Sequence, residues 1–372
     1  MDKKWIEIGK QKGLSDLEIF SVKTKKRSLT VYQGKLDSHV ESDVEQVTMR
    51  GIYQGKIASV RFENLGTTNV EQMIDHIILN TGALTVSEPA IIFEGSKTYQ
   101  KVSEERYDFS QIPVTDKIDL LKTLESKILS DENVTQVQTS TYQEIDTETQ
   151  LINSKGLNLS KRHTYAYAYA IGVFKKGDDI KTAYDMELAK SFHDFNVEEM
   201  ATKTIRKGTL KLGGTSIASG AYPVVFSNEM FSNILGVFSP IFSGEAAYRN
   251  LTALKDKVGE QVFGPNINLF EDPFHEKSHF KVPFDDEGVA CYKRPIVEKG
   301  VFKGFNHNLK TASIFNVEPT GNGFANGISP TNLFLEPTDL SFDDMIMPIK
   351  DGIYITNLFG LHAGVKTVSG DS

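Results

Sequence analysis

The segment His275-Glu276-Lys277-Ser278-His279 has the residue types and the spacing of a zinc peptidase motif. When H-E-x-x-H lies on a helix, both imidazoles project from one face and bind zinc, and the Glu acts as general base toward a zinc-bound water. The pattern alone identifies His275 and His279 as candidate metal ligands and Glu276 as a candidate catalytic residue. The corresponding chemistry is metal-assisted peptide hydrolysis.

The residues around this segment predict a loop and not a helix. Pro273 and Pro283 lie ten positions apart, which leaves space for two helical turns at most. None of the residues 275–279 is apolar, so no face could hold two ligands rigidly against a domain. His307 is a third candidate ligand by residue type alone. We favour a solvated polar loop and keep a free-standing zinc metallopeptidase that uses this motif as the alternative.

Other residues with reactive potential indicate structure more than chemistry. Cys291 is the only cysteine and has no neighbouring His, which favours a buried, inert thiol over a nucleophile. The Gly-rich stretch 320–327 is not followed by the Lys and helix start of a phosphate-binding loop. Tyr165, Tyr167 and Tyr169 alternate with alanines, so they form either a ligand-stacking row or, as we favour, a sheet face packed under a helix.

Composition sets the broad class. The 372 residues carry 41 Lys and Arg against 49 Asp and Glu, a net charge of −8, which argues against a surface that holds nucleic-acid phosphates. We find no apolar run of 18 residues and no secretory signal, so we expect a cytoplasmic protein that does not enter a membrane. At about 150 residues per domain, the length predicts two domains.

The hydrophobic periodicity predicts an α+β fold, with mainly antiparallel sheet and packed helices in both domains. Strands within 17–62 are separated by Gln-Gly turns, and apolar residues at helical spacing predict helices over 70–81 and 115–130. The Gly-Gly sequence near 213 divides a domain of residues 1–211 from a strand-rich domain of residues 216–372.

Five short motifs in the second half occur in an order that resembles the TldD/PmbA family, whose members have also been called modulators of DNA gyrase. These motifs are Gly220–Phe226, Phe284–Val289, Glu298–Gly304, Pro319–Gly323 and Pro330–Leu333. The resemblance covers nearly the whole chain, and 153–156 in the first half fits it too. In this family, further strands follow a Gly-Asp-x-Ser-like motif, so the resemblance implies a C-terminal domain truncated after Ser372.

The resemblance implies a division of labour between two kinds of subunit. The TldD branch carries an H-E-x-x-x-H zinc motif and cleaves unfolded peptides. The TldE (PmbA) branch lacks the ligands and pairs with TldD in a heterodimeric protease for microcin-type peptides and antitoxins. That motif aligns with residues 244–249 here, where Gly244 and Arg249 replace the histidines and only Glu245 is retained. An Arg guanidinium has no lone pair for zinc.

The chain is therefore expected to resemble the non-catalytic TldE/PmbA branch. It would hold no cofactor itself, and zinc would lie in a TldD-like catalytic subunit that forms a dimer with it. Its other expected partners are an unfolded or extended peptide and, when it is alone, a second copy of itself. Gly244, Glu245 and Arg249 are the expected peptide-groove residues. A DNA-topology function is suggested only by the historical family label, and the acidic composition argues against it.

Overall fold

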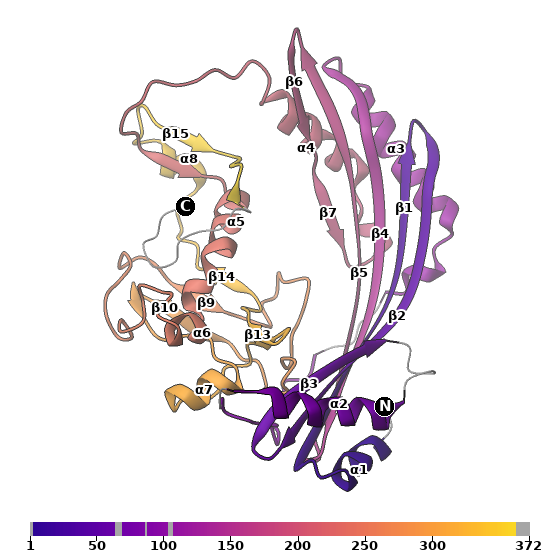
Figure 1. Cartoon of the computed structure of the whole chain (residues 1–372). Helices are drawn as coiled ribbons and strands as arrows, with labels where there is room; N and C mark the ends of the chain where they lie inside the picture. The colour runs from indigo at the N-terminus through magenta and orange to yellow at the C-terminus, as the bar shows by residue number, and fades with distance from the viewer. Residues whose placement is uncertain (1–2, 64–68, 86–87, 103–106, 362–372) are drawn as a thin grey trace.

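The computed structural model describes residues 3–63, 69–85, 88–102 and 107–361 (Figure 1). The N-terminal half consists of one long sheet with helices packed on it. Its strands are β1 (Asp16–Tyr32), β2 (Lys35–Tyr53), β3 (Lys56–Glu63), β4 (Val134–Asn153), β5 (Asn158–Lys176), β6 (Asp179–Ala183) and β7 (Met186–Ala189). Its helices are α1 (Lys4–Gln11), α2 (Val70–Ala83), α3 (Val114–Leu129) and α4 (Val197–Thr209), with 3-10 turns at Phe109–Gln111 and Phe192–Asp194.

The long sheet is antiparallel throughout. Its order is β3-β2-β1-β4-β5-β6, and β7 also pairs with β5. Two residues connect β1 to β2 and two connect β2 to β3. Positive φ angles occur at both residues of each connection, Gln33 and Gly34 in the first and Gln54 and Gly55 in the second. A type I′ turn requires this conformation at both central residues. The predicted Gln-Gly turns are therefore confirmed. The helices predicted over 70–81 and 115–130 are confirmed as α2 and α3.

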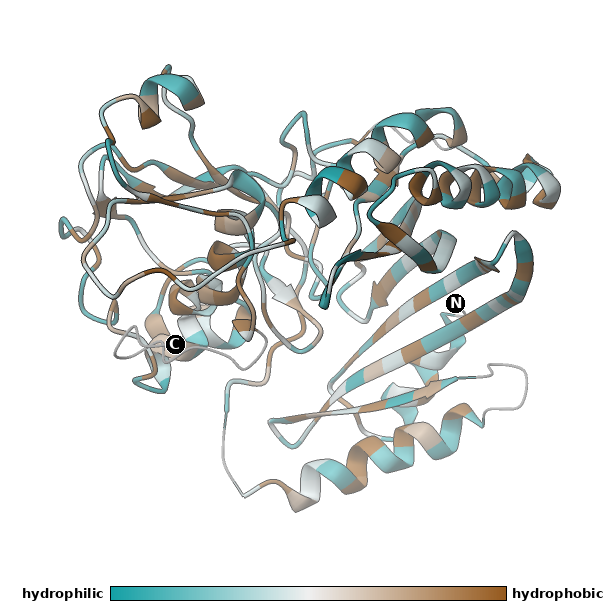
Figure 2. Cartoon of the chain, turned by 90° about the horizontal axis from the view of Figure 1, so that it is seen from above, coloured by the Kyte–Doolittle hydropathy of each residue, from teal (hydrophilic) through white to brown (hydrophobic). Residues whose placement is uncertain are grey.

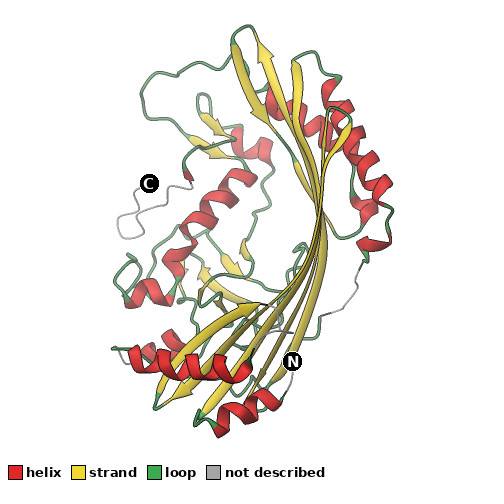
Figure 3. Ribbon diagram, turned by 45° about the vertical axis from the view of Figure 1, so that its right-hand side comes forward, coloured by secondary structure: helices red, strands yellow, loops and turns green. Residues whose placement is uncertain are grey.

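Two pairs of helices pack on the sheet and build its two cores. Helices α3 and α4 cover a core around Leu29 and Tyr142, and α1 and α2 cover another around Leu17 and Met49. Figure 3 shows the helix pairs at opposite ends of the strongly twisted strands. Hydrophobic and hydrophilic residues alternate along these strands in Figure 2, as expected for a sheet with two different faces.

The alternating Tyr and Ala residues of β5 lie on opposite faces of the sheet. Ala166 and Ala168 are fully buried in the core beneath α3 and α4. Tyr165 lies on the other face, where its ring packs against Phe280 of the C-terminal half with 5.0 Å between ring centroids. The prediction that the tyrosines pack under a helix is therefore wrong. The alanines have that position, because small side chains let the helices approach the sheet closely.

The C-terminal half contains shorter elements around a core that includes Phe242, Ile296 and Phe302. Its helices are α5 (Asn228–Phe238), α6 (Gly244–Tyr248), α7 (Leu309–Phe315) and α8 (Phe342–Ile346), with a 3-10 turn at Ser239–Phe242. Its strands are β8 (Val224–Phe226), β9 (Leu269–Glu271), β10 (Arg294–Glu298), β11 (Val301–Phe302), β12 (Gly323–Phe324), β13 (Gly327–Ile328), β14 (Leu333–Leu335) and β15 (Ile353–Ile355).

Four of these strands form a sheet in the order β11-β10-β9-β14, β12 pairs with β13, and β15 pairs in parallel with β8. The predicted α+β class with mainly antiparallel sheets is confirmed. Within the described parts of the chain, no helix has both the length and the apolar character needed to cross a membrane.

A close contact between α4 and the long sheet provides a test of this packing. A Cβ atom at Gly208 would lie 2.2 Å from Cε2 of the fully buried Phe174. We predict that Gly208→Ala lowers the free energy of unfolding by about 2 kcal/mol, because the ring or the helix must move. Urea unfolding followed by circular dichroism measures the change.

Gly82→Ala is the matched control, because Gly82 lies in α2 and a Cβ atom there would meet no other atom within 4 Å. This variant should be as stable as the wild type or slightly more stable. Equal stability of the Gly208→Ala and Gly82→Ala proteins would contradict the described packing of α4.

Candidate functional site

A buried ion-pair network joins the long sheet to the C-terminal half. Arg50 on β2 donates from Nε to Oε1 of Glu18 at 2.8 Å and from Nη1 to Oε1 of Glu287 at 3.2 Å. Burial raises the pKa of Glu18, although Arg50 opposes this shift. Burial also disfavours the charge on Arg50, but the two carboxylates outweigh it and hold the Arg50 pKa above its ordinary value. Removal of Arg50 would leave both carboxylates without their counter-charge, and the cost would be greatest at the fully buried Glu18.

Glu287 extends this network to helix α7. Its Oε2 accepts a hydrogen bond at 2.8 Å from the backbone N–H of Leu309, the first residue of α7. A carboxylate at this point satisfies an otherwise unpaired N–H and interacts favourably with the helix dipole. The carbonyl of the adjacent Gly288 accepts a hydrogen bond from the Tyr99 hydroxyl at 2.7 Å. The loop at 285–288 thus fixes α7 relative to the long sheet.

A buried histidine, His307, packs against Gly244 at the start of helix α6. A Cβ atom at Gly244 would lie 2.5 Å from Nδ1 of His307, and His307 is 6% exposed. The same Nδ1 lies 3.1 Å from Oγ1 of Thr311 on α7. Burial, with a smaller contribution from the Arg294 charge, lowers the pKa of His307 to about 4. A neutral imidazole therefore fills the space that a side chain at position 244 would need.

Glu245, the next residue, is paired with two cations. Its Oε1 accepts a hydrogen bond from Nε of Arg249 at 2.6 Å, and its Oε2 lies 2.9 Å from Nζ of Lys310. Burial favours a higher pKa, but these two partners outweigh it and lower the pKa of Glu245. Lys310 also approaches Glu88 at 3.6 Å. The three predicted residues thus lie together at one short helix. The charge of the Glu245 carboxylate is already balanced there by Arg249 and Lys310.

These residues do not fit a divalent metal ion. Zinc sites use imidazole, thiolate and carboxylate donors. Position 244 has no side chain, the Arg249 guanidinium has no lone pair, and Lys310 places a positive charge where a metal would bind Glu245. Within the part of the chain that the structure describes, no group of three or more His, Cys, Asp or Glu side chains could hold a metal ion.

The H-E-x-x-H segment forms a turn. Residues 275–279 contain no helix, and Nδ1 of His275 accepts a hydrogen bond from the Lys277 N–H at 3.3 Å. The His275 ring packs against Phe334 with 4.2 Å between centroids, while Glu276 and His279 are exposed. The predicted loop is confirmed, and the helical spacing that would align the two imidazoles is absent. Cys291 is buried, as predicted, and burial raises the pKa of its thiol.

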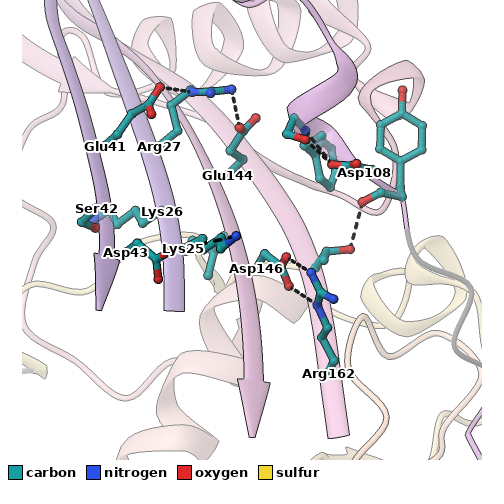
Figure 4. Close-up of a pocket in the computed structure, with 15 residues that line it drawn as sticks. Lys25, Lys26, Arg27, Glu41, Ser42, Asp43, Asp108, Glu144, Asp146 and Arg162 are labelled. Carbon is teal, nitrogen blue, oxygen red and sulfur yellow. Dashed lines mark hydrogen bonds and ion pairs between the residues drawn. The ribbon is translucent and has the colours of Figure 1, made fainter. Parts of the chain in front are cut away.

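A depression of about 850 Å³ lies beside residues 107–110 on the helix-covered face of the long sheet (Figure 4). Its charged side chains are largely paired within its own wall. Arg27 donates to both Glu41 and Glu144 at 2.8 Å, and Arg162 bonds to Asp146. This depression therefore offers a ligand little uncompensated charge.

Sequence patterns do not reveal the residues that organise the α6 region. Lys310 belongs to no motif, His307 stands out only as a candidate metal ligand, and Arg50 has no local pattern that marks it. Arg50 and Glu287 lie 237 residues apart, Lys310 lies further still from Arg50, and only the fold brings these residues together. The one available signal is the position of Glu287 within a family-like motif.

Two family models match the chain. The model described as the PmbA/TldA metallopeptidase central domain matches residues 107–212, and the model described as the C-terminal domain matches residues 219–372. An uncharacterized protein of Methanocaldococcus jannaschii is 25% identical over 99% of this chain and 85% of its own length. The metalloprotease PmbA of Escherichia coli is 26% identical over 54% of this chain and 43% of its own length.

Solved structures of proteins with similar folds are also known. A Thermotoga maritima protein, described provisionally as a modulator of a DNA gyrase, is 31% identical with a TM-score of 0.89, over 99% of this chain and 84% of its own. TldE from Thermococcus kodakarensis shares the fold, with 23% identity and a TM-score of 0.83, over 96% of this chain and 82% of its own.

The buried His307 predicts a pH dependence of stability. Its folded-state pKa of about 4 lies below its ordinary value of 6.5, so the unfolded chain binds a proton first as the pH falls. The stabilisation is complete above pH 6.5 and is lost as the pH falls toward 4. Between pH 7 and pH 4, the free energy of unfolding should therefore fall by about 3 kcal/mol more for the wild type than for His307→Gln.

Urea titrations at each pH measure this difference. The variant His76→Gln, at an exposed position of α2, is the control and should follow the wild-type profile. Parallel wild-type and His307→Gln profiles would mean that position 307 is not buried as a neutral imidazole.

Proposed function

Since the chain belongs to the PmbA/TldD family of metallopeptidases, we propose that it is the TldE/PmbA-like subunit of a two-chain metalloprotease that processes unfolded peptides. In this proposal, the zinc ion and the general base lie in a TldD-like partner. This chain contributes part of the groove in which the peptide lies. Its location would be the cytoplasm, and its substrates would include peptides of the microcin type and antitoxins.

One observation carries this proposal: side chains of the protein itself fill the space around α6 that a metal ion and its ligands would need. The resemblance places the zinc motif at 244–249, where His307 fills the space beside Gly244 and two cations hold Glu245. A carboxylate bound by Lys310 and Arg249 cannot serve as a base toward a metal-bound water. No metal-dependent step is therefore assigned to these residues.

Arg249 and, to a lesser extent, Glu245 are accessible to a peptide. Arg249 has 60% of its side chain exposed, although it pairs with Glu245, so it is accessible to a carboxylate of a substrate or of the partner chain. Gly244 and Glu245 lie about one turn before it on α6. We propose Glu245 and Arg249 as part of the peptide groove, whereas Gly244, predicted with them, is buried against His307 and cannot contact a peptide directly. We also propose a homodimer as the state of the chain without its partner.

The experiment that tests this function is reconstitution with a TldD-like protein encoded in the same genome. We predict that this chain alone does not cleave a fluorogenic unfolded peptide, and that the mixture cleaves it and loses activity with a zinc chelator. Glu245→Gln in this chain should change the cleavage rate less than about threefold. Replacement of the motif Glu in the partner should abolish cleavage.

Cleavage by this chain alone, abolished by Glu276→Gln and unaffected by Lys277→Gln, would contradict the proposal. That result would support the free-standing zinc peptidase that uses His275, Glu276 and His279. Failure of the two proteins to bind one another, measured by size-exclusion chromatography, would also contradict it.

A further inference from the structure

A pocket between the two halves of the molecule lies apart from the residues of α6. It has a volume of about 530 Å³, which is in the range of sites that enclose small ligands or a few peptide residues. Its floor is the face of the long sheet that carries Phe20, Arg50 and Lys161, and its roof comes from the segments 280–287 and 323–332. In Figure 1, β13, which belongs to the roof segment, lies on the side of the C-terminal half that faces the long strands.

The pocket is basic, although the chain as a whole is acidic. Four cationic side chains line it, from Arg50, Arg61, Lys161 and Lys281, against the two carboxylates of Asp286 and Glu287. The net charge of the whole chain is −8. Because a cleft lined by an excess of positive charge attracts anions, this local reversal of charge points to an anionic ligand.

Two of the four cations are already engaged by protein groups. Arg50 is held by Glu18 and Glu287, as described above. Lys281 donates to backbone carbonyls, including that of Phe274 at 3.2 Å. Arg61 on β3 is exposed at the rim, and the described residues give it no ion pair. Arg61 and Lys161 are therefore the cations available to a ligand.

Lys161 is the better placed of the two. Its Nζ donates to the carbonyl of Phe284 at 2.7 Å and lies 4.6 Å from the ring of Phe284 and 5.6 Å from that of Phe324. The structure shows no ion pair for Lys161 within its described residues, and an ammonium group has three N–H donors. Burial lowers the pKa of Lys161, and the carboxylates of Asp286 and Asp285 only partly oppose this shift. An anion beside Nζ would supply the missing counter-charge.

We propose that this pocket binds a carboxylate of an extended peptide through Lys161, with Arg61 at its entrance. The half-buried rings of Phe20, Phe280 and Phe324 would contact the apolar side chains that neighbour the carboxylate. No helix N-terminus lines the pocket among the described elements, so the backbone N–H groups that commonly bind a phosphate are absent there, and this favours a carboxylate. That the ligand is a peptide rests on the proposed function.

Binding to the purified chain without its partner tests this inference. The probes are three pentapeptides with an uncharged N-terminal dansyl label, measured by fluorescence anisotropy: GALVF with a free C-terminus, its C-terminal amide, and the amide GALDF. The first and third carry a carboxylate at the chain end or on a side chain, and the second carries none. At least one carboxylate peptide should bind roughly tenfold more tightly than the neutral amide.

Variants at the two open cations locate the effect. Lys161→Met should remove the preference for the carboxylate, and Lys161→Arg should retain most of it. Arg61 is exposed, so its replacement should not disturb folding. Arg61→Gln should weaken the binding of the carboxylate peptides by about threefold. Lys175→Met changes an exposed lysine on the same strand β5 and should bind like the wild type.

Equal binding of all three peptides, no binding of any, or an unchanged preference in both Lys161→Met and Arg61→Gln would overturn the inference. Displacement of the peptide by inorganic phosphate at equal concentration would also overturn the choice of a carboxylate. Cleavage by the two-chain protease is scored separately. If cleavage needs both chains while this chain shows no carboxylate preference, the pocket inference fails and the proposed function stands.

Discussion

The arrangement of both halves depends on one largely buried cation, Arg50, which is shared by a carboxylate of the sheet and a carboxylate of the C-terminal half. Glu18 is 1% exposed, so its charge is tolerable only while Arg50 stays beside it. Glu287 bonds to Arg50 through one oxygen and to the start of α7 through the other. The position of α7, and of His307 and Lys310 near its start, therefore follows from this contact.

Through α7, the same contact determines the chemistry available at α6. His307 occupies the space beside Gly244, and Lys310 pairs with Glu245. If the proposed alignment of the zinc motif with 244–249 holds, protein cations and a neutral imidazole occupy the place of the metal and its ligands. The surface that remains can bind and orient a chain, which is consistent with a supporting role in proteolysis.

The sequence predicts what depends on local pattern, and misses what depends on the fold. Strand alternation and Gln-Gly turns identify the sheet, and the two prolines identify the loop around His275. The prediction for the tyrosines of β5 names the wrong face, because alternation shows that two faces differ without showing which one a helix covers. The partners of Glu245 could not be predicted, since Lys310 lies 65 positions further along the chain and belongs to no motif.

The zinc content of the purified chain shows whether the protein holds a catalytic metal ion of its own. The protein should be prepared without a His tag, exposed to zinc, and measured by elemental analysis after dialysis. We expect a zinc content near zero per chain, because neither α6 nor the turn at 275–279 presents a suitable set of ligands among the described residues. About one zinc per chain, lost in His279→Ala and retained in Lys277→Ala, would contradict it.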